Sequence, residues 1–150
     1  MTDNVIALSP DDNLSKASEL MSSKKIRHIP IVNENQNLVG LITQHDVLKA
    51  ATSCLDASSN NADKNVPVSR IMITKVRTIS PNERLKAAGL IMEKYKYGCI
   101  PVLSNDKLIG IITDTDFVGV AINLIEQMDY MEESEEGIED EIEQEVKFIT

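Results

Sequence analysis

One sequence pattern occurs twice in this chain, and that internal repeat limits its fold more than any other feature. The stretch that begins at Val5 aligns with the stretch that begins at Val76 at a constant shift of 71 positions. The identical pairs are Val5/Val76, Ser9/Ser80, Pro10/Pro81, Leu14/Leu85, Ala17/Ala88, Met21/Met92, Ile29/Ile100 and Pro30/Pro101. So many matches at one shift indicate two copies of one structural unit.

The alignment continues after a polar turn that is one residue shorter in the second copy. Beyond this turn the shift becomes 70, and the pairs are Leu38/Leu108, Gly40/Gly110, Ile42/Ile112, Thr43/Thr113 and Asp46/Asp116. Each copy therefore ends an aliphatic run with the same Thr-x-x-Asp spacing.

Each copy has the pattern of a short strand, a helix, two strands joined by a polar turn, and a second helix. In the first copy we expect Ser9-Pro10 to open a helix, because Leu14, Ala17 and Met21 follow at helical spacing. Residues 28–32 and 38–43 are rich in β-branched side chains and flank an Asn-rich turn, which predicts a hairpin. One copy is too small to bury a core alone. The sequence therefore predicts an α+β fold in which two β-α-β-β-α repeats pack as one pseudo-two-fold unit with two equivalent clefts.

Composition changes divide the chain into four segments. We expect a first repeat at 1–51, a polar and turn-forming linker at 52–68, a second repeat at 69–125 and an acidic extension at 126–150. The hydrophobic content of 42% in 150 residues suits one compact domain with one core.

The acidic extension accounts for the net charge of −9. Residues 126–150 hold eleven acidic side chains and one lysine, so the rest of the chain has a net charge of +1. A helical apolar face continues past the second repeat into the extension at Leu124, Ile125, Met128 and Met131, and a second apolar stripe follows at Ile138, Ile142, Val146 and Ile149. We expect a helix with a solvated acidic face and an apolar stripe that packs on a second copy. The alternative is a docking helix for a basic protein partner.

Several functional classes are disfavoured by the sequence. The near-neutral body and an aromatic content of 3% argue against a nucleic-acid binder. No leader-like segment and no apolar run of membrane-spanning length occurs, so we expect a cytoplasmic protein. Cys54 and Cys99 lack a redox or zinc spacing, and a disulfide is not expected. His28 and His45 are the only histidines, and no hydrolase, metalloprotease or phosphate-loop motif occurs, so we expect no enzyme activity, metal site or cofactor.

The repeated Thr-x-x-Asp has two interpretations. In the first it is a capping box, in which Thr43 accepts from the Asp46 amide and the carboxylate reaches back. In the second, an aspartate in a first helical turn lies beside free N–H groups that suit phosphate, and it accepts both hydroxyls of a ribose. Both roles can coexist, since a carboxylate has two oxygens.

The doubled pattern "SP…L..A…M…IPIV…LVGLIT..D" and "SP…L..A..IM…IPVL…LIGIITDTD" resembles a tandem pair of cystathionine β-synthase (CBS) domains, also called a Bateman module. The resemblance covers roughly Val5 to Ile122. It implies AMP, ADP, ATP or S-adenosylmethionine in clefts between the copies, pairing into homodimers, and control of a separate or attached protein.

The resemblance also assigns ligand-binding residues by position. The ribose-binding acid corresponds to Asp46 and Asp116, and the preceding hydroxyl residue to Thr43 and Thr113. The other positions it implies are Arg27, His28, Ile29, His45, Met72, Thr74, Thr78 and Thr115.

The copies are not equivalent in these positions. His28 corresponds to Cys99, which favours an anionic ligand in the first cleft. Only Met1 to Asn4 precede the first copy, so the Asp116 cleft is expected to lack a wall that the Asp46 cleft has. We therefore expect Asp46 to mark the better nucleotide site. The sequence leaves two hypotheses for the function of the chain. The first is a regulatory sensor of an adenosyl ligand, and the alternative is a structural dimerisation scaffold with empty or vestigial clefts.

Overall fold

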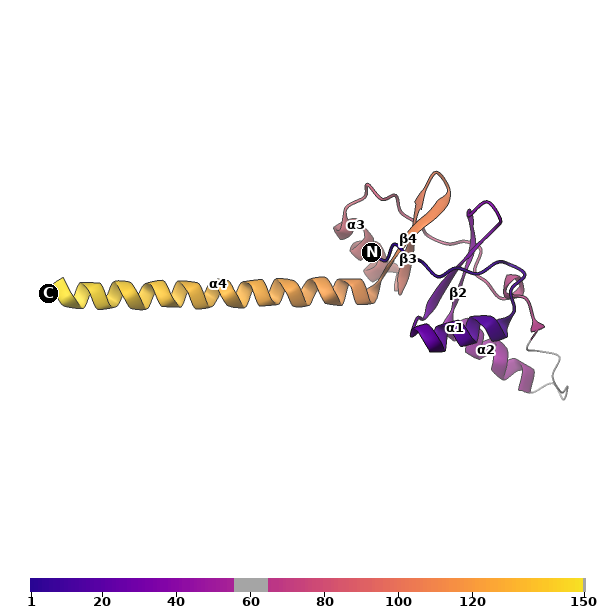
Figure 1. The fold of residues 1–150 in the computed structure, drawn as a ribbon, viewed down its shortest axis with the longest axis horizontal. Helices are drawn as coiled ribbons and strands as arrows, with labels where there is room; N and C mark the ends of the chain where they lie inside the picture. Colours follow the sequence, from indigo (N-terminus) through magenta and orange to yellow (C-terminus); the bar gives the residue numbers. More distant parts are fainter. Residues whose placement is uncertain (56–64, 150) are drawn as a thin grey trace. The chain divides into compact units, whose positions relative to one another are not determined.

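A computed structural model describes residues 1–55 and 65–149, and the surroundings of side chains in 1–52 and 65–131. The chain divides into two compact units, Met1–Thr113 and Asp114–Thr150. The first unit contains both predicted hairpins and most of the helices (Figure 1). Its elements in order are α1 (Leu14–Lys24), β1 (His28–Val32), β2 (Leu38–Thr43), α2 (Gln44–Leu55), η2 (Val68–Arg70), α3 (Leu85–Tyr95), β3 (Cys99–Ser104) and β4 (Lys107–Thr113).

The two predicted hairpins form, and both are antiparallel. In the first, β1 pairs with β2 so that His28 faces Thr43; in the second, β3 pairs with β4 so that Cys99 faces Thr113. The shorter second turn places Asn105 and Asp106 at positive φ, the backbone geometry that a two-residue hairpin loop requires. The one-residue difference between the turns explains why the alignment shift changes from 71 to 70.

Each hairpin gains a further segment on both edges, in the same way in the two repeats. Leu8 lies parallel to Ile31 beside β1, and its counterpart Ile79 lies parallel to Val102 beside β3. On the opposite edges, Ile73 pairs with Leu41 of β2, and Thr2 pairs with Ile111 of β4. The segment before each repeat therefore lines the sheet of the other repeat.

This exchange corrects one expectation from the sequence. Residues before Val5 were expected to be too few to supply the second repeat with a wall, but Thr2 exchanges two backbone hydrogen bonds with Ile111, at 3.1 and 3.2 Å. The Met1 side chain lies over Gly110 as the Met72 side chain lies over Gly40. The short N-terminal segment suffices because Thr2 pairs with the edge of β4 and the Met1 side chain covers Gly110.

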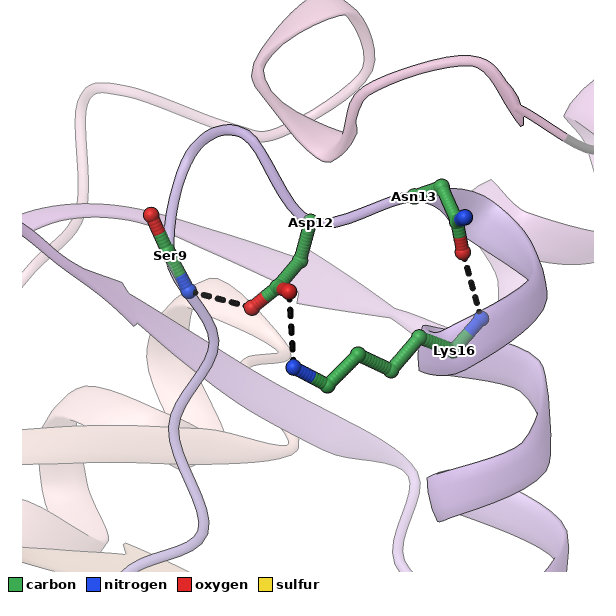
Figure 2. A network of polar contacts seen from close by, with 4 residues as sticks. All are labelled: Ser9, Asp12, Asn13 and Lys16. Carbon is green, nitrogen blue, oxygen red and sulfur yellow. Dashed lines mark hydrogen bonds and ion pairs between the residues drawn. The ribbon is translucent and has the colours of Figure 1, made fainter.

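The first helix begins later than the Ser9-Pro10 signal predicts. Ser9 to Asp12 form a turn, and α1 begins at Leu14 with Asn13 as its N-cap, whose side chain accepts from the Lys16 amide at 2.9 Å. Figure 2 shows this bond beside the Asp12 carboxylate, which accepts from the Ser9 amide at 2.8 Å and from Lys16 Nζ at 2.7 Å. Asp12 therefore stabilises the turn before the helix and reaches Lys16 in its first turn.

The apolar faces predicted from helical spacing are buried. Leu14, Ala17 and Met21 of α1 pack with Ile29, Ile31 and Ile42 of the sheet and Val47 of α2. A second, smaller cluster joins Leu41 and Ile111, which occupy corresponding positions in the two repeats, with Cys99. The repeats therefore share an apolar junction, as the size of one copy predicts.

The second unit is the single helix α4 (Asp114–Ile149), which confirms the predicted helical extension. From Val118 to Met131 its larger apolar side chains are exposed. The stripe at Ile138, Ile142, Val146 and Ile149 and the residue Cys54 lie outside the residues whose side chains are described. Among the described residues, no helix has the length and apolar character needed to cross a membrane.

Candidate functional site

The centre of the candidate site is the junction of β2 and α2, where Thr43 and Asp46 bind each other. Asp46 Oδ2 accepts from the Thr43 amide at 3.0 Å and from Thr43 Oγ1 at 2.6 Å, and the Asp46 amide donates to Thr43 Oγ1 at 3.2 Å. Both residues are half-buried. The arrangement is the reciprocal capping box that the Thr-x-x-Asp spacing predicts.

The capping box occupies only one oxygen of the Asp46 carboxylate. Both hydrogen bonds that the Asp46 carboxylate accepts from Thr43 end on Oδ2, and within the described part of the chain no hydrogen bond reaches Oδ1. Thr43 and Asp46 thus fix the carboxylate rigidly at the start of α2 while one acceptor oxygen stays available. The amides of the first helical turn lie beside it.

Thr43 lines a cavity of about 290 Å³ between the two repeats. Its floor is apolar, with Leu41, Ile73, Val76 and Cys99, while its polar lining carries positive charge. The residues that supply these polar or cationic groups are His28, Thr43, Lys75, Arg77, Lys96 and Tyr97. A volume of this order is near the lower end of the range for small-molecule sites.

His28 reaches this cavity from the start of β1, opposite Thr43 in the strand register. The ring lies against Gly98, where an added Cβ would come within 2.8 Å of both Cε1 and Nε2. A side chain at position 98 would therefore force the His28 ring to move. The predicted pair of His28 and Thr43 shares one cavity.

Asp46 lines a different cavity, of about 460 Å³, whose lining also includes the cationic residues Lys49 and Arg70. Leu14, Ala50, Val66 and Ile71 supply its apolar walls. The hydrogen bonds between Thr43 and Asp46 therefore link the linings of the two cavities.

The other predicted residues of the first site lie in varied surroundings. Ile29 is fully buried in the core, while Arg27, His45 and Thr74 are exposed. Met72 is half-buried and packs over Gly40, where an added Cβ would be 2.5 Å from its sulfur. Met72 therefore packs against the apolar core of the first repeat, and its predicted contact with a ligand stays a prediction.

The predicted residues of the second site fall in both units. Thr113 ends β4 and Thr78 precedes Ile79, both half-buried within the first unit. Thr115 and Asp116 begin α4 in the second unit, where the Thr115 amide donates to Asp114 Oδ1 at 2.9 Å. These four residues remain predicted ligand contacts.

Sequence reasoning missed the cationic residues of the Thr43 cavity. Lys75 and Arg77 come from the segment before α3, and Lys96 directly follows that helix, so no short sequence window contains all three. A signal was present in the repeat alignment, because Lys75 and Arg77 stand opposite the uncharged Asn4 and Ile6. Among the described residues, no group of three or more metal-ligating side chains gathers.

The family model that matches this chain is the CBS domain, over residues 1–53 and 68–123. Among curated proteins, the chain is 33% identical over 118 residues to protein MJ1225 of Methanocaldococcus jannaschii, covering 79% of this chain and 40% of that protein. It is 32% identical over 114 residues to homoserine O-acetyltransferase of Methanococcus vannielii, covering 75% of this chain and 22% of the enzyme. The chain thus spans less than half the length of these two relatives.

Solved structures match over most of their length. The protein AcuB from Vibrio cholerae superposes with a TM-score of 0.76 at 38% identity, covering 87% of this chain and 92% of that one. The CBS domain pair of MJ0100, in complex with 5-methylthioadenosine and S-adenosylmethionine, gives a TM-score of 0.70 at 25% identity, with coverage of 82% and 92%. CBSX2, in complex with AMP, gives 0.71 at 25% identity, with coverage of 83% and 93%.

These matches confirm the predicted fold class and the tandem repeat. The family model covers both halves that the internal alignment identified, and whole CBS domain pairs superpose on the chain. The chain therefore belongs to the CBS domain family and contains two CBS repeats.

Proposed function

We propose that this chain is a regulatory module that binds an adenosine-containing ligand at the Thr43–Asp46 pair and thereby modulates a protein partner. The observation that carries the proposal is the fixed carboxylate of Asp46 with one acceptor oxygen available at the start of α2. Similarity to CBS pairs in complex with AMP or with S-adenosylmethionine supports an adenosine ligand.

The chemistry of the pair suits a ribose. Thr43 holds the carboxylate in one orientation, so Oδ1 can accept from a ribose hydroxyl without loss of side-chain freedom. Each hydrogen bond to a charged group contributes about 1.5 to 3 kcal/mol. The amides at the start of α2 and the cationic lining of the Thr43 cavity suit the phosphate end of a nucleotide.

Thermal unfolding of the full chain with AMP, ADP, ATP, S-adenosylmethionine and NADH tests this proposal. A ligand that binds only the native state raises the unfolding temperature by mass action. Asp46→Asn keeps the side-chain volume and removes the charge, so it should abolish most of the shift, while Asp12→Asn in the same repeat should leave it unchanged. The absence of any shift in the wild-type protein would refute the sensor.

Titration calorimetry compares the two repeats. We propose Thr113 and Asp116 as the corresponding pair of a weaker second site, so Asp46→Ala should reduce affinity more than Asp116→Ala. Equal losses in the two variants would contradict this ranking.

A second candidate is a structural dimerisation module whose clefts hold no ligand. It is favoured by the capping box, because bonding to Thr43 accounts for Asp46 without any ligand. Analytical ultracentrifugation with and without nucleotide separates the candidates, because a scaffold would form the same homodimer in both conditions. In either case we propose a cytoplasmic, non-catalytic role, with the acidic helix α4 as the contact for a protein partner.

A further inference from the structure

The helix α4 carries a heptad pattern that continues beyond the CBS repeats. The family match ends at residue 123, whereas α4 runs on to Ile149 as one helix (Figure 1). From Phe117 onward, alternating steps of four and three residues trace the a and d positions of a coiled coil, which we call the seam. The seam residues are Phe117, Ala121, Leu124, Met128, Met131, Glu135, Ile138, Ile142, Glu145 and Ile149. Apolar residues that keep this spacing over about four heptads are typical of a helix that pairs with another helix.

The described part of the seam is open to solvent. Leu124, Met128 and Met131 each expose more than half of their surface. The helix forms a compact unit of its own. Apolar side chains at regular seam positions gain stability only when a second surface removes them from water. The seam therefore has the character of one half of a helix pair.

The positions beside the seam carry negative charge. In the acidic stretch 126–145 the e and g positions, which flank the seam, include no lysine or arginine. Their acidic residues are Glu132, Glu139 and Glu141. Glu135 and Glu145 add two carboxylates within the seam, and Lys147 falls at position f, away from it. Charges at e and g select the partner of a coiled coil, so this seam selects a positively charged helix.

A second copy of α4 does not supply the complementary charge. In a parallel pair equivalent seam residues meet, so Glu135 would face Glu135 and Glu145 would face Glu145. In an antiparallel pair the acidic stretch could avoid its copy only by lying beside residues 117–125, which include no charged residue. Neither pairing forms an attractive charge pair beside the seam. Like charges that meet across a seam act against self-association.

The acidic stretch also repels itself along the helix. Like charges four residues apart destabilise an isolated helix, and opposite charges stabilise it. Glu143 and Lys147 form the attractive pair at this spacing. The repulsive pairs include Glu132/Glu136, Glu135/Glu139, Glu139/Glu143 and Glu141/Glu145. A positively charged partner therefore stabilises α4 more than a neutral one does.

We propose that α4, from Leu124 onward, forms a heterotypic coiled coil with a basic amphipathic helix of a protein partner. The inference rests on the proposed regulatory function, in which α4 contacts the partner, and it names the chemistry of that partner and its mode of binding. Apolar seam residues of the partner cover Leu124, Met128 and Met131. Lysine or arginine beside its seam pairs with the carboxylates of the acidic stretch.

The probe is a synthetic peptide of about four heptads with leucine in its seam and lysine at e, at g and opposite Glu135. The control peptide has the same composition in an order without heptads. Fluorescence anisotropy with the full chain should give a Kd at least about tenfold lower for the heptad peptide. Circular dichroism of the mixture should show more helix than the sum of its parts. Equal affinity of the two peptides would show binding by charge alone and would overturn the inference.

Two neighbouring residues of similar exposure test the seam. Met131 lies in the seam, whereas Tyr130 falls at position c, outside it, and both are exposed. Met131→Gln should weaken binding of the heptad peptide by about fivefold or more, and Tyr130→Gln by less than about twofold. Equal losses in the two variants would overturn the seam.

The flanking charge is tested by two triple variants that remove the same charge. The variant beside the seam is Glu132→Gln with Glu139→Gln and Glu141→Gln. The control, at positions b and f, is Glu133→Gln with Glu136→Gln and Glu143→Gln. The first should weaken binding of the heptad peptide by about tenfold and the second by less than about threefold. Equal effects would overturn the role assigned to the flanking carboxylates.

The remaining outcomes separate this inference from its rival and from the proposed function. Loss of a wild-type homodimer on Met131→Gln, measured by sedimentation, would make a second copy the occupant of the seam and overturn the inference. Nucleotide-induced shifts in unfolding temperature without peptide binding would overturn it too, and would leave the adenosine sensor standing. Binding of the heptad peptide without any nucleotide shift would support the coiled coil and overturn the sensor.

Discussion

The two repeats follow the same backbone path but differ at the polar residues along it. Lys25 and Lys96 both end their first helix in the left-handed conformation, and Ala17 and Ala88 are both fully buried. By contrast, Asn13 caps α1 whereas its counterpart Arg84 makes no side-chain cap on α3. The comparison indicates that apolar burial holds the shared fold while the polar positions are free to diverge.

The lining of the Thr43 cavity shows the same divergence. Lys75 and Arg77 of the second repeat line this cavity, and the uncharged Asn4 and Ile6 stand at the corresponding positions of the first repeat. Substitutions at corresponding positions can test where the repeats are equivalent and where they are not.

The largest effects are expected from Ile29→Ala and Ile100→Ala, at corresponding core positions. Both isoleucines have 0% exposure, so each truncation removes buried methyl groups and leaves a cavity. Each variant should lose about 2 to 5 kcal/mol of unfolding free energy, measured by urea denaturation. If one variant lost an amount within this range and the other lost far less, the two hydrophobic cores would differ in how tightly they are packed.

A smaller and unequal pair of effects is expected from Gly40→Ala and Gly110→Ala. A Cβ at Gly40 would be 2.5 Å from the Met72 sulfur and 3.1 Å from the backbone oxygen of Ile73, so the backbone segment that carries Ile73 must shift. Such overpacking costs about 1 to 3 kcal/mol. At Gly110 the three atoms nearest to the added Cβ all belong to the Met1 side chain, with its sulfur at 2.7 Å. A flexible side chain can move, so we expect a loss below about 1 kcal/mol there.

Gly119→Ala is the control for this pair. Gly119 lies inside α4, and apart from its chain neighbours and the backbone of its own helix no described atom lies within 4 Å of the added Cβ. Alanine in a helix interior is favoured over glycine by about 0.5 to 1 kcal/mol, so helicity measured by circular dichroism should not fall. Equal losses for Gly40→Ala and Gly110→Ala would contradict the difference between a backbone wall and a side-chain wall.

Most of the fold could be predicted from the sequence because it rests on periodic apolar positions. The spacing of Leu14, Ala17 and Met21 predicted the buried face of α1, and the β-branched runs predicted both hairpins. The helix start was predicted too early, because Ser9-Pro10 initiates a turn and the cap is supplied by Asn13. Helix boundaries depend on single hydrogen bonds, which spacing does not reveal.

The candidate site was only partly predictable. Thr43 and Asp46 are three residues apart, so their contact follows from the start of one helix. Lys75, Arg77 and Lys96 line one cavity only because of the tertiary packing of the chain, which a single sequence does not reveal. The pairing of Thr2 with Ile111 was missed for the same reason, since it joins segments far apart in the chain.

The helix caps should respond in opposite directions in the two repeats. Asn13→Ala removes the acceptor for the Lys16 amide and should cost about 1 kcal/mol of unfolding free energy. Arg84 has an extended backbone like Asn13, with φ −70° and ψ 140°, so Arg84→Asn can adopt the same cap and should gain about 0.5 to 1 kcal/mol. A loss on Arg84→Asn in thermal unfolding would show that the arginine has a role that its counterpart lacks.

The smallest effect concerns the carboxylate before each of these helices. The side-chain hydrogen bond from Lys16, helped by the Ser9 amide, holds the pKa of Asp12 below its ordinary value of 3.8. A lowered carboxylate pKa contributes stability above the unfolded value, and this contribution is lost as pH falls through the folded value. Asp12→Asn should therefore cost about 0.2 to 1 kcal/mol at pH 7, and the cost should fade below about pH 3.8.

Glu83 is the matched control for Asp12. It accepts from the Ser80 amide at 3.5 Å, and Ala87 stands where Lys16 stands in the first repeat. Glu83→Gln should therefore change the unfolding free energy less than Asp12→Asn at pH 7, and its effect should depend less on pH. A pH dependence as large as that of Asp12→Asn would mean that the lysine is not the cause of the lowered pKa, and that the two turns are electrostatically equivalent after all.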